Sequence, residues 1–108
     1  MKMIQAIIRP ERSAEILSEL SDAGFPAVTK IDVAGRGRQR GVKVGDIVYE
    51  EISKELLLIV TEDENVDEMI KIIIKKSRTG EKGAFGDGKI FVSSVERAYT
   101  ISSGESVL

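Results

Sequence analysis

A glycine-rich stretch, TGEKGAFGDGKIFV at residues 79–92, is the part of the chain best suited to bind an anion. It combines four glycines, two lysines and an aspartate ahead of a short apolar run. Glycines let a ligand approach the backbone closely, consecutive N–H groups can converge on an anion, and Lys89 would add a full positive charge. A tight turn at Asp87-Gly88 explains the same residues without any ligand. The residue types are compatible with either interpretation.

The overall composition narrows the chemistry open to the chain. Its 108 residues are 42% hydrophobic and 31% charged, which predicts one folded domain spanning residues 1–108. Cysteine and histidine are both absent. Disulfides, thiolate chemistry, the commonest general base and the commonest zinc ligand are therefore excluded, and we expect no enzyme activity.

The charge balance bears on location and partners. The net charge is −2 and the isoelectric point is about 5.2, so no global positive field exists to hold nucleic acid or an anionic membrane. The sequence contains neither an apolar span of about 18 residues nor a signal-peptide pattern. We therefore expect a cytoplasmic protein with no nucleic-acid partner and no direct membrane insertion.

The first half of the chain has the pattern of a β-α-β unit. An apolar run predicts a strand over residues 2–8, and a helix is expected to begin at Pro10. Its apolar stripe, at positions i, i+1, i+4 and i+7, consists of Ile16, Leu17, Leu20 and Ala23. Gly24 is placed to form a left-handed C-terminal cap. Residues 27–33 alternate as a strand, with Thr29, Ile31 and Val33 on one face.

The second half repeats this plan. We predict strands over residues 56–60 and 89–95, separated by a helix that ends near Ser77. Asn65 and Glu68 have the spacing of a capping box at its start. The helical stripe consists of Val66, Met69, Ile70 and Ile73. Two such halves predict an α+β ferredoxin-like βαββαβ sandwich, with a four-stranded antiparallel sheet and two helices on one face.

The predicted third strand, LLLIV at residues 56–60, has a consequence for assembly. It shows no polar alternation, which predicts that both of its faces are buried. Two helices on one side of the sheet can cover only one of these faces. Self-association is the simplest way to cover the other.

The segment between the two halves, GRGRQRGVKVGDIVYEEIS at residues 35–53, is unusually long for a connection in a small domain. Such loops are typically either functional or flexible. Its alternating arginines and glycines also occur in RNA-binding segments, but stacking aromatics are missing here and the chain is acidic. A binding loop and a solvated hairpin both remain compatible with it.

Several motifs together resemble the PII signal-transduction family, the GlnB/GlnK-like nitrogen regulators. These motifs are MKMIQAIIRPE at the start, GRGRQRG before the long loop, TG and GDGKIFV after the second helix, and VERAYTISSGE. The resemblance covers essentially the whole chain. It implies a trimer of ferredoxin-like subunits that binds ATP or ADP in clefts between subunits. It also implies a T-loop at about residues 36–53 and a phosphate loop at about residues 79–89.

The resemblance assigns ligand-binding roles to individual residues. For the nucleotide it implies Ile7, Thr29, Gly35, Gly37, Arg38, Gln39, Val60, Gly86, Asp87, Gly88 and Lys89. For the second ligand of the family, 2-oxoglutarate, it implies Gln39 and Lys54. Gln39 would also help to hold a magnesium ion between ATP and the keto acid, which suits the preference of Mg²⁺ for oxygen ligands. The alternative for Lys54 is a solvated lysine at a strand edge.

The sequence also departs from the family pattern. Residues 81–85 lengthen the phosphate loop, and Thr100 and Ser102 stand where the family commonly has two arginines that contact a neighbour's nucleotide. Each charge-assisted hydrogen bond is worth on the order of 1.5–3 kcal/mol. Their loss would lower the nucleotide affinity unless Lys82 in the longer loop compensates. Tyr49 does not fall at the place of the tyrosine that is uridylylated in many bacterial members.

The loop sequence most resembles the archaeal PII-like proteins associated with the nitrogen-fixation operon, which inhibit nitrogenase. The implied function is a nitrogen-regulatory sensor that binds ATP or ADP and 2-oxoglutarate and controls nitrogen fixation by binding nitrogenase through its T-loop. It would act as a homotrimer or as a mixed oligomer with a second PII-like subunit. The alternatives are a PII protein acting on an ammonium transporter or another nitrogen-assimilation target, and a relative that binds a different nucleotide.

Overall fold

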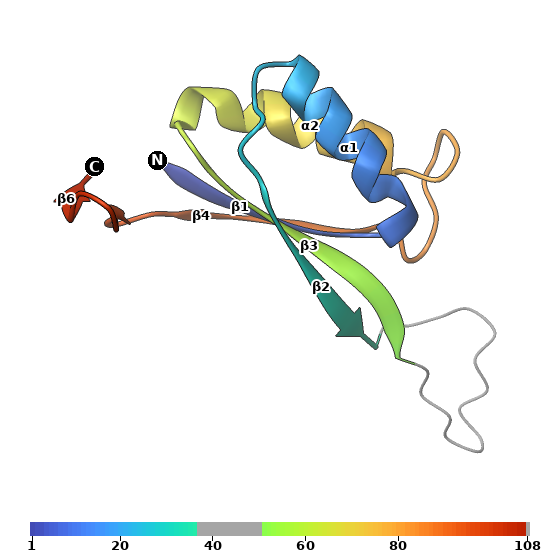
Figure 1. Ribbon diagram of the computed structural model, residues 1–108. Coiled ribbons are helices and arrows are strands. Elements are labelled where there is room, and N and C mark those ends of the chain that lie inside the picture. Colours follow the sequence, from blue (N-terminus) through green and yellow to red (C-terminus); the bar gives the residue numbers. More distant parts are fainter. Residues whose placement is uncertain (37–50, 108) are drawn as a thin grey trace.

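The structure is a computed structural model that describes residues 1–36 and 51–107 (Figure 1). After the first strand, a helix and a strand precede the long loop. A strand, a helix and another strand follow the loop, and a short C-terminal hairpin comes next. The elements are β1 (Lys2–Ile8), η1 (Pro10–Arg12), α1 (Ser13–Asp22), β2 (Thr29–Gly35), β3 (Ile52–Thr61), η2 (Asp63–Asn65), α2 (Val66–Ser77), β4 (Gly88–Ser94), β5 (Tyr99–Thr100) and β6 (Glu105–Ser106).

The main sheet has the strand order β2-β3-β1-β4, and every pairing in it is antiparallel. Both α-helices lie on the same face of this sheet (Figure 1). The predicted ferredoxin-like α+β sandwich is therefore confirmed.

The strand boundaries differ from the predicted ones where pairing extends beyond the apolar runs. β2 covers residues 29–35 rather than 27–33, and β3 begins at Ile52 rather than at residue 56. The two strands pair as far as Gly35 opposite Ile52, so hydrogen bonding to β2 holds the polar start of β3 extended. The last two residues of the predicted T-loop, Ile52 and Ser53, therefore lie within β3, and the last two of the predicted phosphate loop, Gly88 and Lys89, lie within β4.

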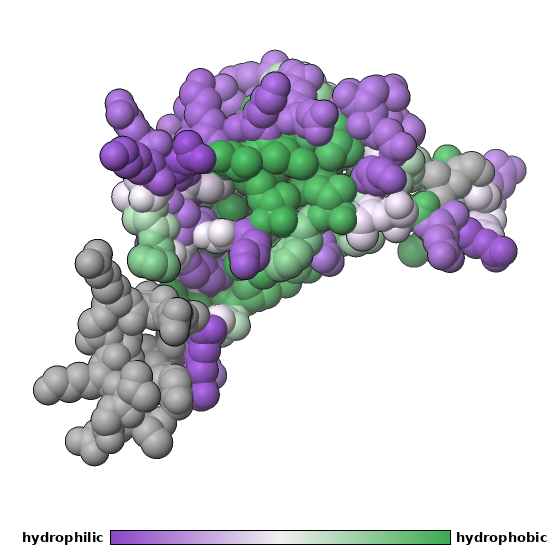
Figure 2. Space-filling view, turned by 180° about the vertical axis from the view of Figure 1, so that it is seen from behind, coloured by the Kyte–Doolittle hydropathy of each residue, from purple (hydrophilic) through white to green (hydrophobic). Residues whose placement is uncertain are grey.

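The core lies between the sheet and the two helices. Alternate residues of the central strands, among them Ile4, Ile8 and Leu57, are at most 1% exposed because they face the helices. The predicted helical stripes supply the other side, through Ile16, Leu20, Val66, Met69 and Ile73. From behind, polar side chains cover the outer helix surface and apolar ones gather beneath it (Figure 2). No helix in the described part of the chain is long and apolar enough to cross a membrane.

Two predicted helix-end features have different outcomes. Gly24 has a φ of 94°, so the left-handed cap after α1 is confirmed, whereas Ala23 is exposed because α1 ends at Asp22. The capping box at Asn65 is wrong. Asn65 is the last residue of the 3₁₀ turn η2 and already has helical angles, φ −93° and ψ −11°, and its side chain caps nothing. A side-chain N-cap requires an extended backbone at that position.

The sheet face opposite the helices is apolar and uncovered within one chain. In LLLIV, Leu57 and Ile59 are buried under the helices, whereas Val60 on the other face is 46% exposed. The register places Ile31 and Phe91 on the same open face, where they are 42% and 49% exposed. The predicted burial of both faces of β3 is thus not achieved within one chain.

We predict that the open sheet face drives self-association, because monomeric proteins rarely expose apolar patches of this kind. Sedimentation at micromolar concentration should show a species larger than one chain. Phe91→Lys should shift it toward the monomer. Glu68→Lys, which adds the same side chain on the solvent side of α2, should not. A wild-type chain that sediments as a monomer would contradict the prediction.

Candidate functional site

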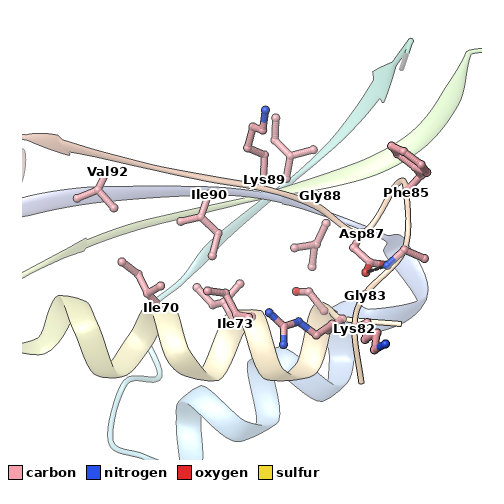
Figure 3. A pocket seen from close by; sticks show the side chains of 16 residues that line it. Ile70, Ile73, Lys82, Gly83, Phe85, Asp87, Gly88, Lys89, Ile90 and Val92 are labelled. Carbon is pink, nitrogen blue, oxygen red and sulfur yellow. Dashed lines mark hydrogen bonds between the residues drawn. The ribbon is translucent and has the colours of Figure 1, made fainter. Parts of the chain in front are cut away.

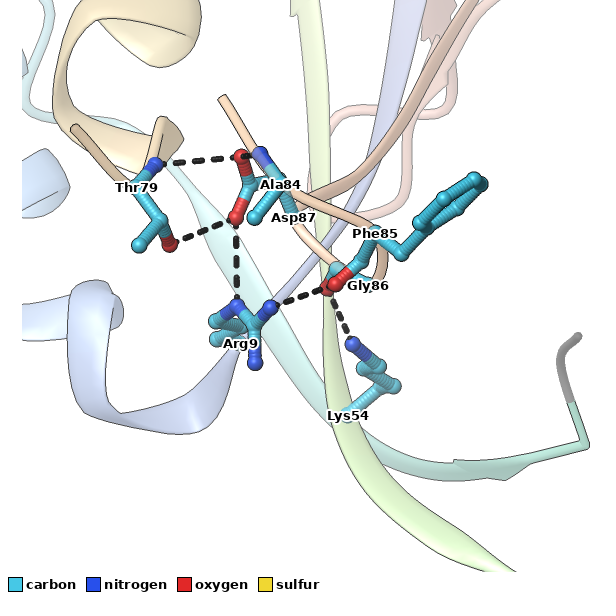
Figure 4. Close-up of polar contacts among 7 residues, drawn as sticks. All are labelled: Arg9, Lys54, Thr79, Ala84, Phe85, Gly86 and Asp87. Carbon is cyan, nitrogen blue, oxygen red and sulfur yellow. Dashed lines mark hydrogen bonds and ion pairs between the residues drawn. The ribbon is translucent and has the colours of Figure 1, made fainter. Parts of the chain in front are cut away.

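The connection between α2 and β4 lies at one end of a cleft along the sheet edge (Figure 3). It is organised by Asp87, whose carboxylate gathers donors from several parts of the chain (Figure 4). Oδ2 accepts hydrogen bonds from the backbone N–H groups of Thr79, at 3.0 Å, and of Ala84, at 2.7 Å. Oδ1 accepts one from the Thr79 hydroxyl, at 2.7 Å. The longer loop at residues 81–85 is thereby closed onto one side chain.

Arg9, at the end of β1, is the fourth donor to Asp87. Its Nε lies 3.3 Å from Oδ1. Burial alone would raise the pKa of Asp87, but the hydrogen bonds from Thr79, Ala84 and Arg9 outweigh it and hold this pKa well below its usual range. Asp87 is therefore a charged residue whose acceptor sites are occupied by the loop, and its role in this geometry is to position the backbone.

Gly88 is required by a close contact between two strands. Its φ is 118°, and a Cβ atom at this position would lie 1.8 Å from the carbonyl oxygen of Ile7. Only a residue without a side chain allows β4 to start this close to β1. The turn at Asp87-Gly88 predicted from the sequence therefore exists, with the positive φ at Gly88.

Two cations hold the outer part of the loop. Arg9 Nη2 donates to the Phe85 carbonyl at 2.7 Å, and Lys54 Nζ donates to the Gly86 carbonyl (Figure 4). Burial and the nearby charge of Arg9 lower the pKa of Lys54, and Glu11 and Asp87 partly offset this effect. Lys54 is therefore not a merely solvated strand-edge lysine. The end of β1 and the start of β3 bring two positive side chains to the same loop.

Arg9 is a site residue that sequence reasoning missed. It belongs to the IIRPE segment, which had served only as part of the family framework. The pairing of Ile8 with Gly88 carries Arg9 to a loop 76 to 78 residues away in sequence. The only local signal was a cation directly after an apolar strand.

The remaining predicted residues fall into two groups. Ile7 and Lys89 are paired across β1 and β4 beside the loop, and Lys89 points away from the helices (Figure 3). Thr29 lies on β2 at the opposite edge of the sheet, and Val60 lies on β3. Three strand spacings, roughly 14 Å, separate β2 from β4. Gly35 ends β2, opposite Ile52.

Some predicted site residues lie outside the described part of the chain. These are Gly37, Arg38 and Gln39, together with Tyr49 and residues 37–50 of the T-loop. The role of Gln39 toward magnesium and 2-oxoglutarate stays a prediction. Among residues 1–36 and 51–107, no group of three or more acidic side chains is placed to hold a metal ion.

We predict that Gly88→Ala destabilises the fold far more than Gly80→Ala. Gly80 also has a positive φ, of 67°, but a Cβ there would meet nothing within 4 Å. Gly80→Ala should therefore cost only the backbone strain, about 1–2 kcal/mol. Gly88→Ala adds a backbone clash and should cost more than about 3 kcal/mol. Urea unfolding of both variants measures the difference, and equal losses would contradict the proposed contact.

We predict that the stabilisation by Asp87 is lost in acid. Because its pKa in the folded state is below the value of about 3.9 for an unfolded aspartate, its contribution is complete above that pH and declines below it. Asp87→Asn should lower the free energy of unfolding by about 1–3 kcal/mol at pH 7. The difference in the free energy of unfolding between this variant and wild type should be smaller at pH 3. Asp22→Asn, an exposed control, should differ little from wild type in its free energy of unfolding at both pH values. If the difference for Asp87→Asn did not change with pH, the stabilisation could not be assigned to the ionised form of Asp87.

Comparisons with known proteins agree with this fold over almost the whole chain. The family model for nitrogen regulatory protein P-II matches residues 1–105. The chain is 52% identical over 108 residues, the whole of both chains, to the nitrogen fixation nifHD2 region GlnB-like protein 1 of Methanosarcina barkeri, and equally to the nifHD region GlnB-like protein 1 of Methanothermobacter marburgensis. It is 41% identical over 110 aligned positions, covering 98% of this chain and 93% of the relative, to the nitrogen regulatory protein P-II 2 of Methanothermobacter thermautotrophicus. The chain therefore belongs to the nitrogen regulatory protein P-II family.

Proposed function

We propose that this protein is a cytoplasmic, non-enzymatic sensor that binds ATP or ADP and 2-oxoglutarate and controls nitrogen fixation by binding nitrogenase through its T-loop. The observation that carries the proposal is the loop before β4, where Arg9, Lys54 and Lys89 surround a glycine-rich backbone. The names of two relatives, which place them in nitrogen-fixation regions, support the choice of process.

The loop has the chemistry that a polyphosphate needs. Gly86 places no side chain between the backbone and the cationic groups of Arg9 and Lys54, and the charge of Asp87 is already engaged by four donors. Arg9 Nη2 and Lys54 Nζ donate to neutral carbonyls, whereas Arg9 Nε pairs with the Asp87 carboxylate. Because hydrogen bonds between charged partners are roughly twice as strong as neutral ones, a phosphate or carboxylate would compete well for both side chains. Lys82, exposed on the longer loop, is a further cation available to the ligand.

The second ligand would depend on the first. ATP and Mg²⁺, when bound, supply the phosphates and the metal that a keto acid can chelate. Gln39 would ligate the metal ion, and Lys54 would hold a carboxylate of 2-oxoglutarate. The place of Lys54 beside Gly86, next to the proposed phosphate site, supports this division of roles.

Two copies of the chain would complete the nucleotide site. Thr29 and Val60 lie on the β2 side of the sheet, whereas the phosphate loop lies at the β4 edge. A cleft between neighbouring subunits brings the first group of one copy to the second group of another. The uncovered apolar sheet face supports the same arrangement, a homotrimer or a mixed oligomer with a second PII-like subunit.

We predict that 2-oxoglutarate binds only when MgATP is present. Calorimetry should detect no keto-acid binding to the protein alone and clear binding to the MgATP complex. Gln39→Ala and Lys54→Ala should each weaken keto-acid binding at least about tenfold, the equivalent of about 1.4 kcal/mol, and keep most of the nucleotide affinity. Lys71→Ala on α2 is the matched control. Equal binding to the ligand-free protein, or normal binding by both variants, would show that the site is misassigned.

We predict a nitrogenase complex that forms without 2-oxoglutarate and dissociates when 2-oxoglutarate and MgATP are added together. Gln39 and Lys54 bracket the loop, so a ligand held at both ends favours one loop shape over the docking shape, and a near-complete shift needs several kcal/mol of differential affinity. Pull-downs with each ligand combination measure how much nitrogenase the protein retains. Deleting residues 42–50 should abolish docking and leave the fold intact. If nitrogenase is retained equally with and without the ligands and with and without the deletion, the proposal is wrong. An ammonium transporter would then be the next target to test.

A further inference from the structure

An aromatic side chain, Phe85, projects from the loop between α2 and β4. Phe85 is 74% exposed, more than any other aromatic residue in the described part of the chain. Figure 4 shows its ring pointing away from the side chains of Arg9 and Asp87, which hold the loop. Single exposed apolar residues are common on protein surfaces, so the surroundings of Phe85 decide whether it can bind a partner.

The backbone that carries Phe85 is held in place on both sides. The Phe85 carbonyl accepts a hydrogen bond from Arg9 Nη2 at 2.7 Å. The preceding residue, Ala84, donates its N–H to Asp87 Oδ2 at 2.7 Å and accepts from the N–H of Asp87 at 3.2 Å. A group whose backbone is already fixed loses less conformational freedom when it binds. Phe85 therefore combines a large exposed apolar side chain with a preorganised backbone.

Positive side chains border Phe85 on the side of α2. Arg78 and Lys82 are exposed and line the same cleft as Phe85, and Lys75 is exposed three residues before Arg78, on the same side of the helix end. Residues 75–82 carry four cations and one carboxylate, although the whole chain has a net charge of −2. The helix dipole accounts for cations in the last turn of α2 but not for Lys82, which lies beyond the helix. The local charge around Phe85 is therefore opposite to that of the whole chain.

We propose that Phe85, Lys75, Arg78 and Lys82 form a docking surface for a different protein, whose matching surface has an apolar pocket edged by carboxylates. Phe85 fills the pocket, as aromatic side chains do at the centre of protein interfaces, and the cations lie at the polar rim. Charges at a rim mainly speed association and select the partner. The contact uses neither the T-loop nor the proposed ligands, and it therefore goes beyond the proposed function.

An acidic protein fits these residues better than a membrane or a nucleic acid does. Membrane-surface binding uses a broad apolar helix face together with a polybasic segment, whereas this surface has one aromatic ring and a few cations. Binding of single-stranded nucleic acid uses several stacking aromatics in a positive groove. Phe85 is the only aromatic residue between positions 71 and 90. One apolar anchor with a charged rim is instead the pattern of a small protein contact.

The test places the photoreactive residue p-benzoylphenylalanine at position 85 of the full chain and irradiates it in a soluble extract of the cells that make the protein. We expect a cross-link to a different protein, through a peptide with Asp or Glu beside the attachment point. The same photoreactive residue in place of Ser18, exposed on α1, should not give this product. Lys75→Glu and Lys82→Glu should each lower the yield at least about fivefold, because they replace attraction by repulsion. Arg97→Glu, exposed at the far end of the sheet, should leave the yield unchanged.

The captured protein is then purified and titrated with the unlabelled chain. Phe85→Ser should weaken binding at least about thirtyfold, as truncation of a central aromatic anchor does. Phe85→Leu, which keeps an apolar side chain, should weaken binding less. Higher salt should also weaken binding, because it screens the charged rim. Urea unfolding checks that the variants fold normally, as expected for a side chain that is largely exposed.

Capture of a protein is not by itself support for the proposal. The surface is supported when the cross-link depends on the charges of Lys75 and Lys82 and the affinity depends on Phe85. The absence of any cross-linked protein, a cross-link only to another copy of this chain, or a yield unchanged by both charge reversals would overturn it. Equal affinity of wild type and Phe85→Ser for the captured protein would do the same. Co-sedimentation with phosphatidylglycerol vesicles that is lost in Phe85→Ser would identify a membrane as the partner and reject the acidic protein.

Discussion

Asp87 ties two points of its own loop and one distant residue, Arg9, to one carboxylate. Thr79 donates from just after α2, Ala84 from the longer loop, and Arg9 from just after β1. The contact works only because Gly88 allows β4 to begin against the backbone of Ile7. With this network in place, the carbonyls of Phe85 and Gly86 are turned toward Arg9 and Lys54. The contacts of Arg9 and Lys54 with the loop therefore depend on one ionised side chain and one missing side chain.

The same network makes ligand binding and local conformation interdependent in the proposed function. Arg9 and Lys54 stabilise the loop by donating to its carbonyls, and an anion would draw on the same donors. Binding then has to alter contacts at the start of β3, which is the strand that follows the T-loop. A ligand changes the loop only as far as its affinity differs between the two arrangements. This placement gives the proposed sensor a physical route from the phosphate site to its docking segment.

The small size of the chain gives a physical reason for linking the proposed assembly to the proposed site. A domain of 108 residues has a limited core, and two helices cover only one face of a four-stranded sheet. Apolar side chains on the other face stay exposed within one chain. In the proposed assembly the surfaces that complete the hydrophobic layers are also those that bring Thr29 and Val60 to a neighbour's phosphate loop.

Local sequence patterns determined the elements of this protein. Apolar periodicity predicted β1 and the buried stripes of both helices, Gly24 marked the end of the first helix, and the glycines before β4 marked its loop, because each of these signals lies within a few neighbouring residues. Only the tertiary structure decided the polar extension of β3, the helical backbone at Asn65 and the roles of Arg9 and Asp87. These features depend on strand register and on contacts between residues up to 78 positions apart, such as Arg9 with Asp87. No local pattern encodes such a distance, because it is set by which strands pair and at which residue the pairing begins.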